Sequence, residues 1–441
     1  MTGALKSPSG TKLRSGGALA ALAASGALFC LVYAVVFNFR RDFTVSDFAP
    51  HIAWALQMDG RSILASFYNG QERLWHIFVR LLCGMGVPNI WTAAGLVTAA
   101  ADASACFLVC RALDRTVPEK LPRPLLAGLV LCVFLAGSLT LPGHSFYRGR
   151  GAVNTWHNPT NIMVRPFAAA VFYMTANIYD RRRARGPAAV SGGLSAQLAQ
   201  PVFTRAELVL YPLCVLLSTY AKPSFLQVFA PAIFLFLLAD VIRTRGKLLP
   251  FCVKLALAYL PAAAIVLVQA SQFFGGGVAA GTAALEAAPS GSASEAAGVA
   301  VYFLQPAFSG PGDFLHAMAE NLLPVLYPCA FPLAVLLAAP RQSWKKTDFR
   351  LGWLCLAVGL LEMLLLHETG SRADHGNFAW GYYLSIWLLW TTAAGTYAGL
   401  LREEGPSGTA ARWICTPLLA WHLACGVGYV ARILRTVQYY F

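Results

Sequence analysis

The chain has 441 residues, of which 57% are hydrophobic and only 12% are charged, and its formal net charge is +14. The apolar share exceeds that of ordinary soluble domains, and no stretch is long and polar enough for a soluble domain of typical size. Apolar runs of roughly 18–25 residues recur from end to end, which is long enough to cross the ~30 Å hydrocarbon layer. The sequence therefore predicts one all-α polytopic membrane domain over residues 1–441.

The positive charge does not indicate nucleic-acid binding. Most Lys and Arg residues lie in short loops between apolar runs, where membrane topology accounts for them. The eleven cysteines lie mostly inside apolar runs, and none forms a CxxC pair. Cys106 and Cys110 share a helix face but have no adjacent His, so we expect buried apolar residues there instead of a metal site. No cofactor is firmly implied, and a divalent metal lacks support.

The first apolar run, over residues 16–37, follows the basic residues Lys6, Lys12 and Arg14. It is too long for the apolar core of a typical signal peptide, and no clear small-residue cleavage site follows it. We expect a retained first span with a cytoplasmic N-terminus, so that the next loop lies outside.

The remaining apolar runs predict ten further spans and a C-terminus outside. Their approximate bounds are 88–110, 124–141, 161–179, 206–219, 224–242, 249–270, 315–339, 350–366, 377–400 and 411–431. The break between the fifth and sixth of the eleven spans falls at Lys222-Pro223. This assignment places every dense basic cluster, including RRRAR at 181–185, on the cytoplasmic side, as the positive-inside tendency requires.

Two external loops have distinct expected roles. In the first, residues 38–87, the segments 51–59 and 71–84 are interpreted as amphipathic helices that lie in the outer interface. The second, residues 271–314, contains a low-complexity stretch at 275–300 that is either a mobile lid over a site or an unconstrained insertion.

With the sides assigned, the uncommon polar residues gather on the outer face of the membrane. The candidate substrate-binding residues are His51, Arg148, Arg150, His157, Asn158, Arg165, Lys222, Glu368, Arg372, His375 and Asn377. Cations on this face run against the charge bias of membrane proteins, and an anionic ligand is one explanation, because Arg binds phosphate bidentately and Lys acts as a point charge. The other explanation for these cations is that solvated loop arginines pair with Glu368 or Asp374.

Asp47 is the candidate acid–base residue. It lies in S-D-F-A-P-H, just before a helix expected to start near Pro50. Either Ser46 or Asp47 is a helix cap that accepts backbone N–H bonds, or Asp47 deprotonates an acceptor hydroxyl. His51 lies four residues on, on the same helical face, and could orient a phosphate or the acceptor. Asp42 is the competing base.

Other polar residues have structural explanations. In W-H-N-P-T, residues 156–160, Asn158-Pro159 favours a turn and a helix start, so Asn158 can be a structural residue. Asp102, Lys254 and Glu362 fall inside predicted spans and must face the protein interior or a wet cavity. We expect Asp102 to be an interhelical hydrogen-bond partner.

Two segments, RRDFTVSDFAPHIAWAL at 40–56 and SFYNGQERLWHIFVRLLCGMGVPN at 66–89, resemble the GT-C superfamily of integral-membrane glycosyltransferases. That superfamily uses polyprenyl-phosphate-linked sugars and places its catalytic carboxylate in the first external loop, followed by a juxtamembrane helix. The resemblance implies that Asp47 is the base, with Asp42 second. It also implies that the external arginines and Lys222 hold the lipid phosphate, by position and charge.

Two further segments, WHNPT at 156–160 and HGNFAWGYY at 375–383, look like segments of uncharacterised bacterial proteins of this type. The chain departs from many relatives because Asp42 and Asp47 are five residues apart, whereas those relatives have two acids adjacent or one residue apart. There is also no evident soluble C-terminal domain, so the external loops would have to select the acceptor.

The expected function is transfer of a sugar from a polyprenyl-phosphate donor to a cell-envelope glycan, lipid or protein acceptor, with inversion, at the outer face of a bacterial plasma membrane. Three alternatives stay open, one of them a non-catalytic membrane assembly protein for which the outer polar residues would be dispensable. A lipid-diphosphate-dependent ligase or polymerase also relies on external Arg and His residues and need not use a carboxylate base. A transporter or flippase would have charged residues deep within several spans and repeat symmetry. The sequence has few such charges and no visible repeat.

Overall fold

The computed structural model describes residues 25–26, 28, 47–69, 71–116, 122–137, 158–185, 201–274, 298–301, 326–369 and 377–436. The predicted first span and the low-complexity stretch lie largely or wholly outside these residues. The same holds for six of the candidate site residues, namely Asp42, Arg148, Arg150, His157, Arg372 and His375.

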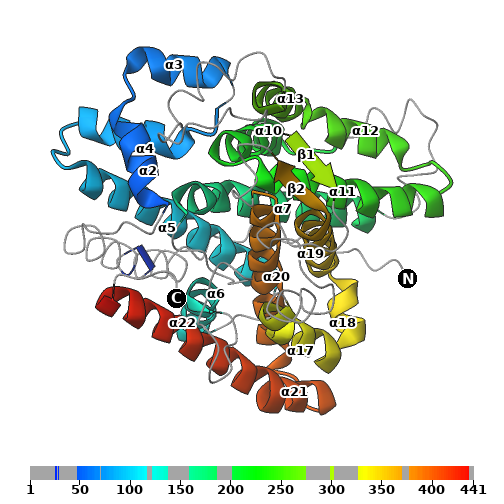
Figure 1. Ribbon diagram of the computed structural model, residues 1–441. Coiled ribbons are helices and arrows are strands. Elements are labelled where there is room, and N and C mark those ends of the chain that lie inside the picture. Colours follow the sequence, from blue (N-terminus) through cyan, green and yellow to red (C-terminus); the bar gives the residue numbers. More distant parts are fainter. Residues whose placement is uncertain are drawn as a thin grey trace.

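Within the described residues the fold is all-α apart from two short strands (Figure 1). The N-terminal helices are α2 (Phe48–Leu56), α3 (Gly60–Tyr68), α4 (Leu74–Gly84), α5 (Ile90–Thr116), α6 (Arg123–Leu135) and α7 (Pro159–Ala184). The middle of the chain forms α10 (Arg205–Ala221), α11 (Ser224–Arg243), α12 (Leu249–Leu257) and α13 (Leu260–Phe274). The C-terminal helices are α17 (Ala330–Ala338), α18 (Pro340–Lys345), α19 (Thr347–Leu365), α20 (Ala379–Leu400), α21 (Pro406–Ala410) and α22 (Thr416–Thr436). Strand β1 (Gly298–Val301) pairs antiparallel with β2 (Leu366–Thr369), with Gly298 opposite Thr369.

The helices coincide with the predicted apolar runs where these are described, and α2 and α4 match the two predicted interfacial helices. Helix α3 was not predicted. It begins at Asp59, whose side chain accepts the backbone N–H of Ser62 at 2.7 Å, while the Ser62 hydroxyl accepts the Asp59 N–H. This reciprocal capping box satisfies two backbone donors of the first turn and so favours a helix in a segment that apolar periodicity alone does not mark.

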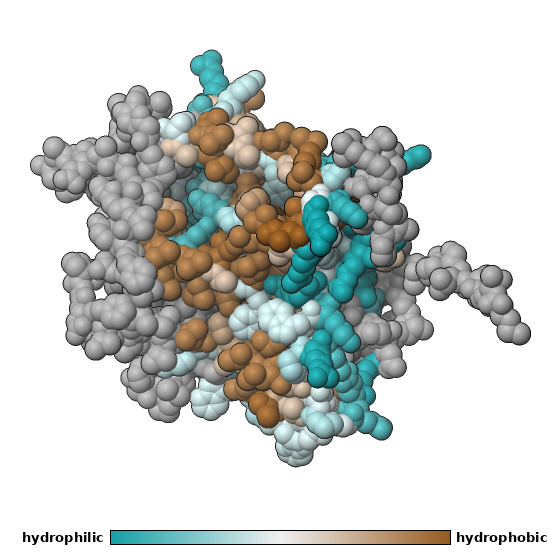
Figure 2. Space-filling model, turned by 90° about the vertical axis from the view of Figure 1, so that its right-hand side faces the viewer, coloured by the Kyte–Doolittle hydropathy of each residue, from teal (hydrophilic) through white to brown (hydrophobic). Residues whose placement is uncertain are grey.

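Two of the described helices, Ile90–Arg115 and Ser224–Arg243, are long and apolar enough to cross a membrane. A third crossing is possible if Leu249–Leu257 and Leu260–Ser271, which meet at 57°, form one broken span. These helices support association with a membrane. Figure 2 views the side of the molecule on which α11, α12 and α18 lie, and shows apolar side chains over its centre beside a vertical band of hydrophilic side chains.

Helix α20 occupies the centre of the molecule, and nearly all of its residues are buried (Figure 1). Its tightest neighbour is α19. A Cβ placed on Gly359 of α19 would lie 2.9 Å from Tyr382 Cα of α20, so the two backbones approach closely because a small residue lies between them. Trp390 of α20 donates its indole N–H to Pro328 O at 2.8 Å.

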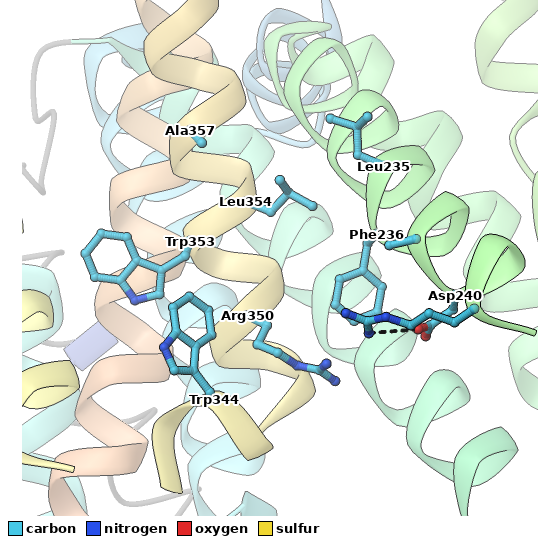
Figure 3. Close-up of a pocket in the computed structure, with 10 residues that line it drawn as sticks. Leu235, Phe236, Asp240, Trp344, Arg350, Trp353, Leu354 and Ala357 are labelled. Atoms are coloured by element: carbon cyan, nitrogen blue, oxygen red, sulfur yellow. Dashed lines mark hydrogen bonds and ion pairs between the residues drawn. The ribbon is translucent and has the colours of Figure 1, made fainter. Parts of the chain in front are cut away.

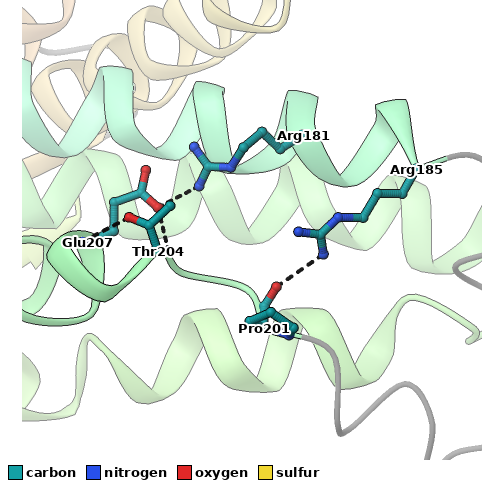
Figure 4. A network of polar contacts seen from close by, with 5 residues as sticks. All are labelled: Arg181, Arg185, Pro201, Thr204 and Glu207. Carbon is teal, nitrogen blue, oxygen red and sulfur yellow. Dashed lines mark hydrogen bonds and ion pairs between the residues drawn. The ribbon is translucent and has the colours of Figure 1, made fainter. Parts of the chain in front are cut away.

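Helices α7 and α10 are antiparallel neighbours that define two ends of the bundle. Near the start of α7, Thr160 bonds to Lys222, which follows α10. At the opposite end, Arg181 of α7 forms an ion pair with Glu207, near the start of α10 (Figure 4). The 26 residues of α7 rise about 39 Å, which sets the separation of the two ends. We name them the Asp47 end and the Arg181 end.

The other long helices follow the same alternation. Helix α19 starts at the Arg181 end, where the Thr347 hydroxyl donates to Asp180 Oδ1 at 2.5 Å. Helix α11 ends there, since Arg350 of α19 lies 5.1 Å from the ring centroid of Phe236. At the Asp47 end, the Tyr220 hydroxyl donates to the Phe67 carbonyl of α3 at 2.8 Å. Among the described residues, Asp47, Asn158 and Lys222 thus lie at the opposite end of the bundle from the basic residues at the end of α7.

Candidate functional site

Asp47 precedes α2 at the N-cap position, but its side chain makes no capping hydrogen bond. Its Oδ2 instead accepts the side-chain amide of Asn158 at 2.8 Å. Among the described residues, Asp47 Oδ1 has no hydrogen-bond partner. The capping explanation for Asp47 is therefore wrong, and one of its carboxylate oxygens is available to a ligand.

Asn158 has two roles at the start of α7. Its Oδ1 accepts the backbone N–H of Asn161 at 2.8 Å, which caps the helix, and also accepts the Thr160 hydroxyl at 2.9 Å. These two bonds fix the side-chain amide so that Nδ2 points at Asp47. The structural role predicted for Asn158 is confirmed, and the same side chain also positions the candidate base.

Lys222 follows α10 with an extended backbone, and its side chain is buried. Its Nζ donates to Thr160 Oγ1 at 3.2 Å and lies 4.9 Å from the ring centroid of Trp380. A directional chain of hydrogen bonds therefore runs from the Lys222 ammonium through Thr160 and Asn158 to the Asp47 carboxylate. It links three segments that are far apart in the sequence, which is the convergence expected of a site.

A pair of histidines lies beside this chain. His51 Nδ1 and His76 Nε2 are 2.8 Å apart, and His76 is buried. Burial, the neighbouring His76 and the positive charges of Lys222 and Arg73 hold the pKa of His51 well below its ordinary value. Burial and Arg73 lower the pKa of His76 to about 3, against a backbone hydrogen bond that raises it. Both rings are neutral at pH 7, so they act as hydrogen-bonding groups and add no charge to the site.

Aromatic rings enclose the histidine pair. The ring of His51 lies 4.9 Å from that of Trp54 and 6.2 Å from that of Trp75, and the Arg73 guanidinium lies 5.6 Å from the Trp54 ring. Trp75 is fully buried, so these rings surround the histidines with apolar side chains on the inner side.

Glu368 and Asn377 form a second polar contact at the Asp47 end. Asn377 Nδ2 donates to both Glu368 carboxylate oxygens, at 3.1 and 2.8 Å, and its backbone N–H donates at 3.2 Å. This contact ties β2 to the start of α20, and Trp380 on the first turn of that helix meets Lys222. The structure thus uses Glu368 and Asn377 to position one wall of the site.

The structure places Arg165 differently from the expectation. It is buried within α7 and forms an ion pair with Asp102 of α5 at 2.8 Å, about 10 Å along the helix from Asn158. Its guanidinium also lies 5.9 Å from the ring centroid of Trp387. Arg165 therefore does not join the phosphate-binding set, and the prediction that Asp102 is an interhelical partner is confirmed.

Three residues of the site were not assigned a role from the sequence. Thr160 was considered only as part of a helix start, His76 only as part of an interfacial helix, and Trp380 only as part of an aromatic segment. Thr160 and Trp380 lie close in sequence to the candidates Asn158 and Asn377, whereas His76 lies 25 residues from His51 and carried no such signal. Among the described residues, no group of three His, Cys, Asp or Glu side chains could hold a metal ion.

Comparison of the sequence with models of known protein families finds no match, and no curated protein sequence is similar to it.

Proposed function

We propose that the chain is a membrane glycosyltransferase with a GT-C-like arrangement of ~11 spans, which moves a sugar from a polyprenyl-phosphate donor to an acceptor with Asp47 as the base. The observation that carries the proposal is the hydrogen-bonded chain from Lys222 to Asp47. It holds a carboxylate and an ammonium in one cluster while keeping them from pairing directly. Asp47 thereby keeps one carboxylate oxygen for the acceptor, and Lys222 places a positive charge in the same cluster.

The chemistry follows from the available atoms. The acceptor hydroxyl oxygen attacks the anomeric carbon, its proton passes to Asp47 Oδ1, and the bond from that carbon to the phosphate oxygen breaks. The polyprenyl phosphate leaves with the bonding electron pair, and the configuration of the sugar inverts. The leaving group needs charge stabilisation more than protonation, and the Lys222 ammonium, which is held by Thr160, places a positive charge in the same cluster.

The orientation is part of the proposal. The basic residues of α7, α11 and α18 gather at the Arg181 end, which favours that end as cytoplasmic. The Asp47 end then faces the outside of a plasma membrane, with α2 and α4 in the outer interface. Lipid-linked donors reach such a site from within the outer leaflet, and envelope acceptors reach it from the aqueous side.

The test uses the full chain reconstituted in lipid nanodiscs, with radiolabelled polyprenyl-phosphate sugars and extracted envelope glycans and lipids as acceptors. Asp47→Asn is expected to lower the transfer rate by about 10²–10⁴-fold, the usual contribution of a general base. Asp59→Asn is the matched control, because Asp59 is an exposed helix cap and Asn caps as well as Asp. The control is expected to keep full activity.

A second variant separates binding from proton transfer. Lys222→Met keeps the length of the side chain but removes the charge, so binding of polyprenyl phosphate is expected to weaken by about tenfold, as for loss of one charge-assisted hydrogen bond. Near-full activity of Asp47→Asn with a lipid-diphosphate donor would instead indicate a ligase or polymerase. Movement of lipid across the bilayer with no transfer would indicate a flippase.

A further inference from the structure

A groove of about 430 Å³ lies at the Arg181 end, between the second half of α11 and the first half of α19 (Figure 3). Leu235 and Ala357 lie at its apolar end and Leu354 lies between the helices, whereas Asp240 and Arg350 lie at the polar end. The groove is thus apolar at one end and charged at the other along the axes of the two helices.

The groove opens on a surface suited to lipid. Helix α11 is one of the two described helices that are long and apolar enough to cross a membrane, and only 44% of its apolar window is buried inside the protein. Leu235 is 46% exposed and Phe234 beside it is 62% exposed. Trp344, which lines the polar end, is 46% exposed, and Trp side chains favour the level of lipid headgroups.

The polar end carries a cation that forms no direct ion pair with a described residue. Arg243 pairs with Asp240 at 3.3 Å, whereas Arg350 forms no ion pair within the described part of the chain. The Nε of Arg350 is buried without a hydrogen-bond partner, and its Nη2 lies 3.4 Å from the Thr347 hydroxyl. A buried guanidinium donor that lacks an acceptor is costly, and an oxyanion in the groove would supply the acceptor.

The surrounding charges favour a ligand with net negative charge. Arg350 has two positively charged neighbours, Arg183 and Arg243, and two negatively charged ones, Asp180 and Asp240. With Arg350 itself, three cations face two anions. The ammonium group of a zwitterionic headgroup would be repelled by Arg183 and Arg243. An anionic headgroup would neutralise the excess positive charge.

We propose that this groove binds a glycerophospholipid with an anionic headgroup, with its phosphate beside Arg350 and an acyl chain along Leu235, Leu354 and Ala357. The site lies at the opposite end of the bundle from Asp47, so it is separate from the proposed transferase site. It would anchor α11 against α19 in the leaflet that faces the Arg181 end.

Native mass spectrometry of the full chain, released from nanodiscs that contain phosphatidylglycerol and phosphatidylcholine in equal amounts, tests the proposal. The wild-type chain is expected to retain one phosphatidylglycerol with about tenfold preference over phosphatidylcholine. Arg350→Gln is expected to remove that preference. Arg341→Gln, which removes an exposed positive charge at the same end but outside the groove, is expected to keep it within twofold.

A variant without charge change tests the acyl-chain part. Ala357→Phe fills the apolar end of the groove and is expected to lower retention of phosphatidylglycerol about tenfold. Leu361→Phe, on an exposed position one turn further along α19, is expected to leave it unchanged. Equal retention of the two lipids by the wild-type chain would overturn the proposal without any variant. So would binding by Arg350→Gln or Ala357→Phe at the wild-type level in a chain that melts normally.

Discussion

The two ends of the α7 and α10 pair contain the same three kinds of group in different arrangements. At the Arg181 end, Thr204 caps α10 in a capping box with Glu207, and Arg181 contacts the Glu207 carboxylate directly at 2.5 Å (Figure 4). At the Asp47 end the cap is Asn158, the cation is Lys222 and the carboxylate is Asp47. There the cap and Thr160 lie between the two charges.

This difference separates a structural contact from a functional one. In the direct pair, Glu207 Oε2 accepts both from Arg181 and from the Thr204 backbone N–H, so the contact joins the end of α7 to the start of α10. At the Asp47 end the cation and the carboxylate are joined through neutral groups, and Asp47 keeps one carboxylate oxygen for a ligand. Charge composition alone does not distinguish the two ends, whereas the order of the groups along the hydrogen bonds does.

The largest effect on stability is expected at a direct ion pair that lies between the two ends. Arg165 and Asp102 have side chains that are 2% and 0% exposed. Arg165→Met leaves Asp102 buried without its counterion, so the free energy of unfolding is expected to fall by about 3–5 kcal/mol. Unfolding in detergent micelles with increasing denaturant measures it.

The matched control is the double variant Arg165→Met with Asp102→Leu. Replacing both members of a buried pair by apolar residues is often neutral or stabilising. The double variant is therefore expected to recover most of the lost stability. A double variant as unstable as the single one would show that the pair contributes through its shape and packing instead of its charge.

The next largest effect on stability is expected at the two helix caps, Asn158 and Thr204. Asn158→Ala and Thr204→Ala each remove a side-chain cap, so each is expected to lower the free energy of unfolding by about 1 kcal/mol. Only Asn158→Ala also frees Asp47, and we expect it to lower transferase activity about 100-fold because a misplaced base loses its geometry. Equal activity in the two variants would remove the functional distinction between the ends.

The sequence predicted most of the described helices, because apolar length depends on residues close together in the chain, but it missed α3 and the break between α12 and α13. It also placed Asp47, Asn158 and Lys222 on one face. It did not predict that Thr160 and Asn158 connect Lys222 to Asp47 by hydrogen bonds. Those bonds depend on how the start of α7 packs against α2 and α10. Arg165 was assigned to the outer face because its position near the start of the predicted span hid the fact that it packs against α5.

Acid is expected to destabilise the Asp47 end. The pKa of His76 is lowered to about 3 in the folded chain, mainly by burial, whereas the unfolded side chain titrates near 6.5. Below pH 6.5 the unfolded chain therefore binds a proton that the folded chain does not, and the free energy of unfolding falls as pH decreases, by about 1 kcal/mol per pH unit for each such histidine. His51, whose pKa is lowered by burial and by His76, adds to the effect.

Denaturant unfolding at a series of pH values between 7 and 5 measures this dependence. His76→Gln removes the titrating group and keeps a hydrogen-bonding side chain beside His51, so its stability is expected to change less steeply with pH. A variant with the same slope as the wild-type chain would place the acid sensitivity elsewhere.

The smallest effect is expected at the Arg181 end. The Arg181 side chain is 38% exposed and that of Glu207 is 14% exposed, so solvent and salt screen their ion pair. Arg181→Met is expected to lower the free energy of unfolding by at most about 1 kcal/mol. This difference between variant and wild type is expected to shrink between about 50 mM and 1 M salt, because salt weakens the ion pair in the wild-type chain. Transferase activity is expected to stay at the wild-type level, because the direct pair lies about 35 Å from the Asp47 end and joins two helix ends. A loss of activity in this variant comparable to that of Asn158→Ala would mean that direct and mediated charge contacts do not differ in function, and the comparison between the two ends would fail.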